Sequence, residues 1–412
     1  MKNRVLRKVA VTGIGVVAPG GVGVEAFWAS LFQSAPPRTV RTIEEFEASE
    51  WMDHRTAKRL DRVSHLAVAA AHEALADAGL LADPAAAPTS TESQLLIDGI
   101  DQTRIAITLG TGIGGVDTLE TQMGVRTERG DRLVSPFTVP MTMPNAPAAA
   151  LSLRYGIQGP AQTITTACAS ATDAIAMGAR LIAEGRADVV LSGGADHSLT
   201  PTCVAGFRNM RALSPTGFSR PFDTARDGLA ASETAGILVL ESLESALARG
   251  ARIYMIVAGS GSTSDAHHLT APSPEGAGAL RCMTEAIDDA ELVPSDVAHV
   301  NAHGTSTPAG DLAEARAIAT LFGAHRPPVT SIKGVTGHSF GAAGAVEAVA
   351  VAMTYATATL PPTVGVTDPD PEMDIDIVTT GRAWEPGPVI SNSFGFGGHN
   401  ASVVFTPPPA AS

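Results

Sequence analysis

The chain has 412 residues, 44% of them hydrophobic and 17% charged, with a formal net charge of -14. This length exceeds the roughly 250 to 300 residues at which one core stops growing, so two packed units are expected. The acidic balance argues against nonspecific binding to nucleic acid or to an anionic membrane surface. Three cysteines are too few and too scattered for a disulfide framework or a zinc cluster.

The first elements in chain order alternate between strand and helix. Residues 8–17 have the pattern of a buried strand that runs into a glycine turn, and residues 60–79 that of an Ala-rich amphipathic helix. Residues 81–103 are rich in Pro, Ala, Ser and Thr and are typical of a surface loop. The amino-terminal segment lacks a convincing cleavage region, and glycines or polar residues interrupt every apolar stretch before it reaches about 20 residues. A soluble, cytoplasmic protein is expected.

Further strand and helix units follow, and the pattern restarts near Gly250. A second strand and glycine turn begin at Arg104, and a helix is predicted over about 169–184. After Gly250 an apolar strand again enters a loop of small residues. The sequence therefore predicts an α/β protein with two similar halves, 1–250 and 251–412, each a sheet with helices on both faces.

Cys168 lies between a β-branched strand and the helix predicted from about residue 169. A sulfur held at a helix N-terminus meets the positive end of the helix dipole, which favours the thiolate needed for acyl transfer. Taken alone, the segment is more typical of a buried core cysteine than of a nucleophile. Cys203 and Cys282 keep that structural interpretation.

Two histidines follow predicted strands in the second half. His303 precedes a Gly, Thr, Ser and Pro loop, and His338 stands before a helix of small residues. An imidazole at a strand end can donate a hydrogen bond or exchange a proton, although a structural role is the commoner one. Lys333 and Glu347 flank His338, and a buried ion pair with an orienting role is expected for them.

Glycine-rich segments elsewhere suggest other possibilities. The carboxyl-terminal glycines at 395, 397 and 398 permit positive φ and could aim backbone N–H groups at one oxygen, although the segment alone is only a β-hairpin. Segments at Gly13 and Gly110 match the G-x-G-x-x-G/A spacing of dinucleotide-binding loops. The first lacks an acidic residue at a strand end about 20 positions on, so a nucleotide enzyme is disfavoured.

Four segments together resemble one known family. TTACAS around Cys168, VNAHGTSTPAGD around His303, SIKGVTGHSFGAAGAVE around His338, and SNSFGFGGHN at the end resemble the elongating, type II β-ketoacyl-acyl-carrier-protein synthases. The resemblance covers essentially the whole chain. It implies a thiolase-like fold with duplicated βαβαβαββ halves stacked as a five-layer α-β-α-β-α sandwich. It also implies a dimer formed through the half that carries Cys168.

The resemblance implies a ping-pong decarboxylative Claisen condensation. Cys168 would take an acyl chain from the phosphopantetheine arm of an acyl carrier protein. Malonyl carrier would then lose carbon dioxide, with His303 and His338 stabilising the enolate. The backbone N–H groups of Cys168 and Phe396 would form the oxyanion hole, and Phe396 with Phe394 would gate the site. No metal or tightly bound cofactor is required.

Other positions receive roles from the same resemblance. Lys333, Glu347 and Asp311 would support the site, Thr305, Thr307 and Thr270 would bind pantetheine, and Ile113 and Phe207 would line the acyl pocket, Ile113 across a dimer interface. Carrier docking is expected at cationic side chains, for which a solvated surface is the competing explanation. They are Arg55, Lys58, Arg59, Arg62, Arg132, Arg208 and Arg211.

Several departures from the family pattern point to a specialised substrate. The segment from Phe32 to Met52 and the loop after Arg211 are short, RDGLAASETAG keeps Glu233 but loses two glycines, and His399 stands where Thr is common. They favour type II polyketide or polyene elongation over fatty-acid elongation, with a homodimer or a heterodimer with a chain-length factor. A noncatalytic ketosynthase-like partner is the alternative from another class, and a thiolase or initiating synthase is a further enzyme alternative. The acyl chain and the carrier are not defined by the sequence.

Overall fold

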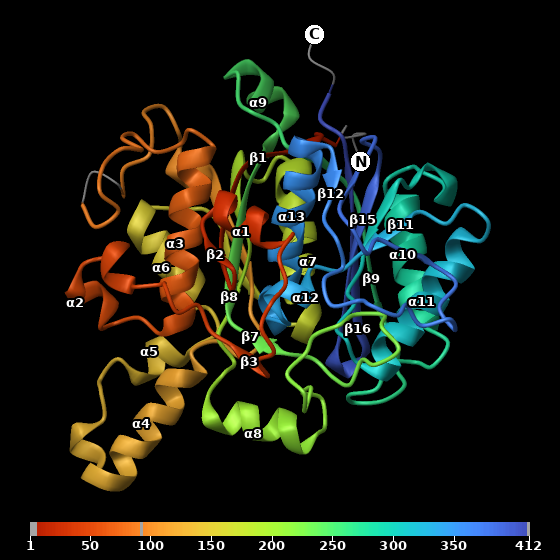
Figure 1. Ribbon diagram of the computed structural model, residues 1–412. Coiled ribbons are helices and arrows are strands. Elements are labelled where there is room, and N and C mark those ends of the chain that lie inside the picture. Colours follow the sequence, from red (N-terminus) through yellow and green to blue (C-terminus); the bar gives the residue numbers. More distant parts are fainter. Residues whose placement is uncertain (1–5, 91–93, 410–412) are drawn as a thin grey trace.

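The computed structural model describes residues 6–90 and 94–409, which form two α/β repeats side by side (Figure 1). The elements of the first repeat are β1 (Val9–Ala18), β2 (Gly21–Val22), α1 (Val24–Ser30), β3 (Val40–Arg41), α2 (His54–Ala57), α3 (Arg62–Asp77), β4 (Ile105–Gly110), α4 (Val116–Arg129), α5 (Thr138–Thr142), α6 (Ala146–Tyr155), β5 (Ala161–Ile164), α7 (Ser170–Ala183), β6 (Val189–Asp196), α8 (Pro201–Asn209), β7 (Ala231–Ser232), β8 (Thr234–Ser242) and α9 (Leu243–Ala248).

The second repeat is shorter. Its elements are β9 (Met255–Ser264), α10 (Ala277–Asp289), β10 (His299–Asn301), α11 (Pro308–Phe322), β11 (Pro328–Thr330), α12 (Lys333–Thr336), α13 (Ala343–Thr357), β12 (Thr359–Leu360), β13 (Asp376–Ile377), β14 (Arg382–Ala383), β15 (Val389–Gly395) and β16 (His399–Thr406). Short 3₁₀ turns η5 (Ala167–Ala169), η7 (Phe340–Ala342) and η8 (Phe396–Gly398) lie next to the residues of the candidate site.

The two repeats have the same strand order. In the first the order is β1-β8-β6-β4-β5, and in the second it is β9-β16-β15-β10-β11, with β13 added at the edge. In both, the first two pairings are antiparallel and the next two are parallel. A short antiparallel pairing of β1 with β9 joins the two sets of strands into one sheet. This duplication is the predicted thiolase-like topology.

The helices divide into two outer layers and one central layer. Helices α3 and α6 cover the outer face of the first set of strands, and α10 and α11 cover that of the second. Helix α3 packs closely on β1 because β1 carries glycines, and a Cβ at Gly15 would lie 2.1 Å from the backbone oxygen of Ala70. Helices α7 and α13 lie between the two sets of strands and contact both. The result is the five-layer α-β-α-β-α sandwich (Figure 1).

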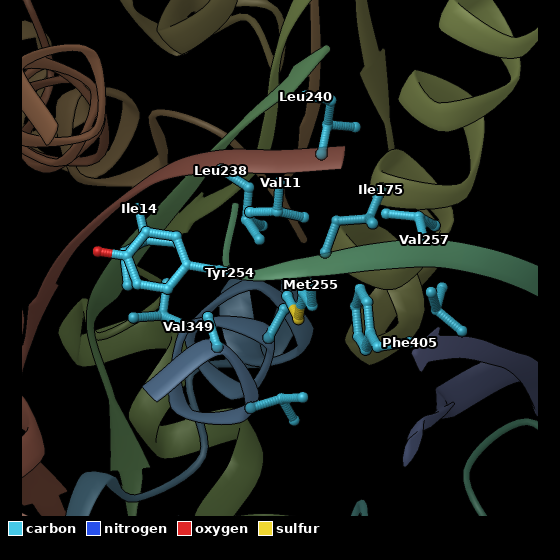
Figure 2. Packing of buried hydrophobic residues seen from close by; sticks show 14 of the residues in the cluster. Val11, Ile14, Ile175, Leu238, Leu240, Tyr254, Met255, Val257, Val349 and Phe405 are labelled. Atoms are coloured by element: carbon cyan, nitrogen blue, oxygen red, sulfur yellow. The ribbon is translucent and has the colours of Figure 1, made fainter. Parts of the chain in front are cut away.

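The central layer is also the largest hydrophobic core. Side chains from both repeats meet there, among them Val11 and Leu238 from the first, Met255 and Phe405 from the second, and Val349 on α13 (Figure 2). The apolar stretch 340–357 is long enough to cross a membrane, but 83% of it is buried inside the protein. Its hydrophobicity is therefore explained by its place between two sheets, as in the core helix of a water-soluble fold.

The expected elements agree with the structure to within a few residues. The helix expected over 60–79 is α3, the helix expected over 169–184 is α7, and the carboxyl-terminal hairpin is β15, η8 and β16. The segment 81–103 is irregular apart from a bridge between Leu81 and Leu96 and the start of a short turn, and its residues 91–93 lie outside the described part. The strand expected to end at His303 ends two residues earlier, at Asn301.

Candidate active site

A sharp turn brings Cys168 from the end of β5 to the beginning of α7. Ala167 takes a left-handed backbone with φ 53°, and Cys168 follows it inside the 3₁₀ turn η5. Ser170 stabilises the turn, since its Oγ accepts a hydrogen bond from the Thr166 N–H at 2.9 Å and donates one to the Ala167 carbonyl at 2.6 Å. A non-glycine residue at positive φ is strained and persists only where the surroundings fix it.

The same turn occurs at the equivalent place in the second repeat, between β11 and α13. Thr166 and Ser339 have similar φ/ψ values, at -123°/42° and -100°/32°, and Phe340 has φ 47° where Ala167 has 53°. The correspondence puts Gly341 in the position of Cys168. We call these segments, residues 166–170 and 339–343, the first and second elbows.

His338 immediately precedes the second elbow, and its Nε2 lies 3.1 Å from the Cys168 Sγ. Its backbone is fixed by β7, because its N–H donates to the Ala230 carbonyl at 2.7 Å and its carbonyl accepts from the Ser232 N–H at 2.9 Å. The two equivalent turns thus bring the Cys168 sulfur, at the amino end of α7, into contact with the His338 ring, which precedes the amino end of α13.

His303 completes the group from the loop after β10. Its ring lies 5.2 Å from that of His338 at an interplanar angle of 86°. One nitrogen of each histidine and the Cys168 sulfur lie within 4.8 Å of one another. All three residues are buried. The structure therefore brings together the three residues that the sequence predicts as catalytic.

A buried ion pair lies beneath the two histidines. The Lys333 Nζ donates to the His303 carbonyl at 2.5 Å and contacts the carboxylate of Glu347 on α13. Both side chains are almost completely inaccessible to solvent. The expected Lys333–Glu347 pair is present, and it ties the His303 loop to the central helix.

Burial dominates the electrostatics of the group. It raises the pKa of the Cys168 thiol to about 11, although the backbone N–H groups of Phe396 and Cys168 and the charge of Lys333 act in the opposite direction. Burial, followed by the Lys333 charge, also holds the pKa values of His303 and His338 well below the usual range. The helix terminus was expected to favour the thiolate of Cys168, but desolvation has the larger effect on the pKa and favours the thiol.

A cavity opens onto the group. Cys168, His303 and His338 line it together with Phe394, whose ring lies 6.1 Å from that of His303. The other residues predicted at the substrate path line it as well, namely Thr270, Thr305, Thr307, Asp311 and Phe396. The hydroxyl oxygens of Thr305 and Thr307 lie 2.9 Å apart, so this part of the cavity wall is polar.

Two backbone N–H groups act on the sulfur. Those of Phe396 and Cys168 lower the pKa of the thiol, against the larger effect of burial. Gly395 brings the strands close, since a Cβ there would lie 2.9 Å from the Cys168 nitrogen. The oxyanion hole predicted from the N–H groups of Cys168 and Phe396 would thus form between the β15–η8 turn and the first elbow, and it stays a prediction.

The two residues predicted for the acyl pocket lie outside this cavity. Phe207 on α8 stacks on Phe340, with ring centroids 4.5 Å apart and planes at 8°. Phe340 in turn contacts the His338 ring at 5.2 Å. The Ile113 side chain is 45% exposed, which leaves it available to a neighbouring chain.

The predicted docking cations divide into two groups. Arg62 is half-buried and donates to both carboxylate oxygens of Glu233, at 2.9 and 2.8 Å, so its assignment as a surface docking residue is corrected to a structural ion pair. Arg59 is exposed, and its guanidinium stacks over the Phe137 ring. The others are exposed as well: Arg55, Lys58, Arg132, Arg208 and Arg211.

Sequence analysis missed two buried carboxylates. Glu314 accepts the backbone N–H groups of His303 at 2.8 Å and Gly304 at 2.7 Å. Asp311 likewise accepts the backbone N–H groups of Phe222 and Ser306. A supporting role was predicted for Asp311 but not for Glu314, which lies one turn later on α11. Burial raises the pKa of Glu314 to about 7 and that of Asp311 to about 6. Their i, i+3 spacing on one helix face was a usable signal.

Asp196 is the second carboxylate that was missed. It ends β6, is buried, and accepts hydrogen bonds from the backbone N–H groups of Gly112 at 2.7 Å and Gly341 at 3.1 Å. The Ser198 hydroxyl donates to its other oxygen at 2.6 Å. The sequence around Asp196 contains no motif that pointed to these contacts.

The duplicated fold and the cysteine with two histidines at its centre define a thiolase-like enzyme. The family model of the β-ketoacyl synthase N-terminal domain matches residues 35–246, and that of the C-terminal domain matches residues 254–367. The chain belongs to the β-ketoacyl synthase family.

Individual relatives agree with this assignment. The chain is 39% identical over 427 residues to the 3-oxoacyl-[acyl-carrier-protein] synthase 2 of Synechocystis sp., which covers 98% of this chain and 99% of the relative. Among solved structures it is similar to the ishigamide ketosynthase/chain length factor, with a TM-score of 0.88, 32% identity and coverage of 98% and 100%. A β-ketoacyl synthase from Burkholderia phymatum gives a TM-score of 0.87 at 33% identity, with the same coverage.

Proposed function

We propose that this protein is a β-ketoacyl-acyl-carrier-protein synthase that joins a malonyl unit to an acyl chain held on Cys168. The observation that carries the proposal is the 3.1 Å contact between the Cys168 Sγ and the His338 Nε2, with His303 within reach of both. The contact supports catalysis over a noncatalytic partner role, because a partner has no need of a nucleophile paired with a base.

In the first half-reaction the Cys168 sulfur attacks the acyl thioester as its proton moves to the His338 Nε2. The new C–S bond forms, the oxyanion is held by the N–H groups of Cys168 and Phe396, and the pantetheine sulfur leaves with the proton. A thiol with a pKa of about 11 needs this transfer, since little thiolate exists before the substrate arrives.

In the second half-reaction malonyl carrier loses carbon dioxide by cleavage of the bond between its α-carbon and its carboxylate. The electron pair stays on the remaining fragment as an enolate, whose oxygen accepts hydrogen bonds from the His303 and His338 rings. Neutral imidazoles donate without carrying charge, which suits rings whose pKa values lie well below the usual range. The carbanion attacks the Cys168 thioester, so that a C–C bond forms and the C–S bond breaks. The 3-oxoacyl carrier is released, and the Cys168 sulfur leaves as a thiolate that takes up one proton from water.

The partner surfaces stay proposals of the same kind. Thr305, Thr307 and Thr270 would bind the pantetheine arm. The exposed cations would attract an acidic carrier; they are Arg55, Lys58, Arg59, Arg132, Arg208 and Arg211. Phe394 and Phe396 would move between the half-reactions. The chemistry assigned to the chain's own residues calls for no tightly bound cofactor or metal. A cytoplasmic location and a domain division near residue 250, between the end of α9 and the start of β9, stay predictions.

Dimerisation is proposed through the first repeat. Strand β5 is the last in the strand order, and its first two residues are exposed. Large apolar side chains stand exposed near it on the insertion between β4 and β5, including Met123, Val139 and Leu153. A second copy or a chain-length-factor-like ketosynthase would cover this surface and place a residue such as Ile113 beside the partner's Phe207–Phe340 pair.

The deciding experiment is intact-mass spectrometry of the protein, alone and with candidate ketosynthase-like partners, after incubation with a panel of acyl carrier thioesters. We expect one acyl mass on the wild type and on Cys203→Ala, and none on Cys168→Ala. Cys203 is a matched control because it is a free, less buried thiol. Failure of every carrier and pairing to acylate the wild type would favour the noncatalytic alternative, and the preferred acyl group would separate fatty-acid from polyketide elongation.

A further inference from the structure

The second elbow repeats the backbone of the first but contains no side chain at the central position. A Cβ added at Gly341 would lie 2.2 Å from the nitrogen of Gly112, so the two glycines pack backbone against backbone. In the first elbow the corresponding residue is Cys168, whose own N–H lowers the pKa of its thiol. In the second elbow, the N–H groups of Gly341 and Gly112 converge on one oxygen of Asp196.

The second elbow is therefore an anion-binding turn that the protein fills with its own carboxylate. Asp196 comes from the end of β6, the strand equivalent to β15, which supplies Phe396 to the first elbow. Burial raises the pKa of Asp196, while the hydroxyl of Ser198, the two N–H groups and the neighbouring His197 favour the charged form. The carboxylate connects the ends of β4 and β6 to the turn before α13.

We propose that Asp196 is a positioning residue of the active site: its carboxylate holds Gly341 and Gly112 and thereby fixes the turn that presents His338 to Cys168. Only Ser339 and Phe340 separate His338 from the anchored Gly341 N–H. Phe340 packs against the His338 ring and stacks on Phe207. The Asp196 carboxylate therefore fixes the position of the His338 ring and of the stacked Phe340 and Phe207 rings beside it. The proposal rests on the proposed function for its kinetic test only.

Two substitutions separate the hydrogen bonds from the charge. Asp196→Asn keeps a carbonyl oxygen that can accept the two N–H groups, whereas Asp196→Ala leaves both unpaired in the interior. For Asp196→Ala we expect kcat to fall about 10- to 100-fold, the cost of a misplaced catalytic group, with KM for the acyl carrier little changed. Asp196→Asn should lose less.

The thiol provides a readout that needs no carrier. The groups that set the Cys168 pKa besides burial are the N–H groups of Phe396 and Cys168, Lys333, and Asp196, which raises it; His338 lies in contact. The pH profile of iodoacetamide alkylation at Cys168 should therefore move to lower pH in both Asp196 variants. A carboxylate that merely supports the fold at a distance would not move this profile.

Glu73 supplies the matched control. Its carboxylate also accepts two backbone N–H groups, from Val16 at 2.8 Å and Val24 at 2.7 Å, but it acts on neither elbow. Glu73→Ala should lower Tm and leave kcat and the alkylation profile unchanged. If Asp196→Ala lowers Tm in the same way and keeps wild-type kcat and alkylation, the proposal is overturned.

Two further arms keep the test decisive. If Asp196→Ala does not fold, the test uses Asp196→Asn and Ser198→Ala instead. Ser198→Ala removes the hydroxyl that donates to the other oxygen of Asp196. An unshifted alkylation profile with wild-type kcat in both would overturn the proposal. If no carrier acylates the wild type, the proposed function fails, while the alkylation profile still decides whether Asp196 acts on the site.

Discussion

The two repeats share a strand order and a turn but divide the chemistry between them. The first supplies the nucleophile, Cys168, and includes long insertions, among them the exposed apolar segment between β4 and β5. The second is lean and supplies both histidines and the buried Lys333–Glu347 pair. The comparison teaches that one backbone design can present a side chain in one copy and exclude it in the other, with the surrounding residues deciding which.

The largest effect should come from removing the imidazole that faces the nucleophile. His338→Ala should slow acylation of Cys168 by about 10²- to 10⁴-fold, the contribution of a positioned general base, since the thiol would lose its proton acceptor. Rapid-quench measurement of acyl transfer checks this. The control is His325→Ala, because the His325 ring binds the Val297 carbonyl outside the candidate site. Equal rates in both variants would contradict the role of His338.

The second largest effect should be a loss of stability when the Lys333–Glu347 ion pair is broken. Lys333→Met leaves the Glu347 carboxylate buried without its partner, and breaking such a pair costs about 3 to 5 kcal/mol. Urea unfolding should show this loss. The double variant Lys333→Met with Glu347→Leu should recover most of the stability but not the activity, because His303 loses the contact to its carbonyl; a double variant as unstable as the single one would argue against the explanation.

A side chain at the second elbow tests the asymmetry directly. Gly341→Ala would place a Cβ 2.2 Å from the Gly112 nitrogen, and overpacking of this kind typically costs about 1 to 3 kcal/mol. Gly206→Ala is the matched change, because a Cβ there meets nothing within 4 Å on helix α8, and it should be neutral or slightly stabilising. Thermal unfolding of both variants gives the comparison, which fails if both tolerate alanine equally.

The smallest expected effect concerns acid. Burial lowers the pKa of His299 on β10 from 6.5 to about 3. Below pH 6.5 His299 therefore binds a proton in the unfolded chain but not in the folded chain, so the free energy of unfolding falls as the pH drops below 6.5. One such group contributes a slope of about 1.4 kcal/mol per pH unit. His299→Gln should flatten the curve between pH 6.5 and 5.5 relative to wild type, measured by urea titration; an unchanged slope would show that His299 is not responsible.

Much of the fold and the core of the site could be predicted from the sequence. Periodicity placed α3 and α7, and the four motifs placed Cys168, His303 and His338 in one site, because each motif sits where a strand ends and a loop begins. The pairing of Lys333 with Glu347 followed from two charges near one apolar helix. These features depend on the local sequence pattern or on motifs that are characteristic of one family and its chemistry.

The remainder depends on contacts between distant segments. Nothing local to Arg62 shows that it pairs with Glu233, 171 residues away, and a surface role seemed reasonable for a cation at a helix start. The ionisation of Cys168 depends on how completely neighbouring segments exclude water, which its own helix does not determine. Asp196 acts through backbone groups of glycines, and backbone groups leave no signature in the sequence.

The shared central layer has a consequence for how this chain folds. Helices α7 and α13 each contact strands of both repeats, and one hydrophobic cluster draws side chains from both. A polypeptide cut between Ala248 and Met255 would leave two fragments that each expose half of that cluster. We therefore expect neither fragment to fold on its own, and the two fragments should regain structure when they are mixed.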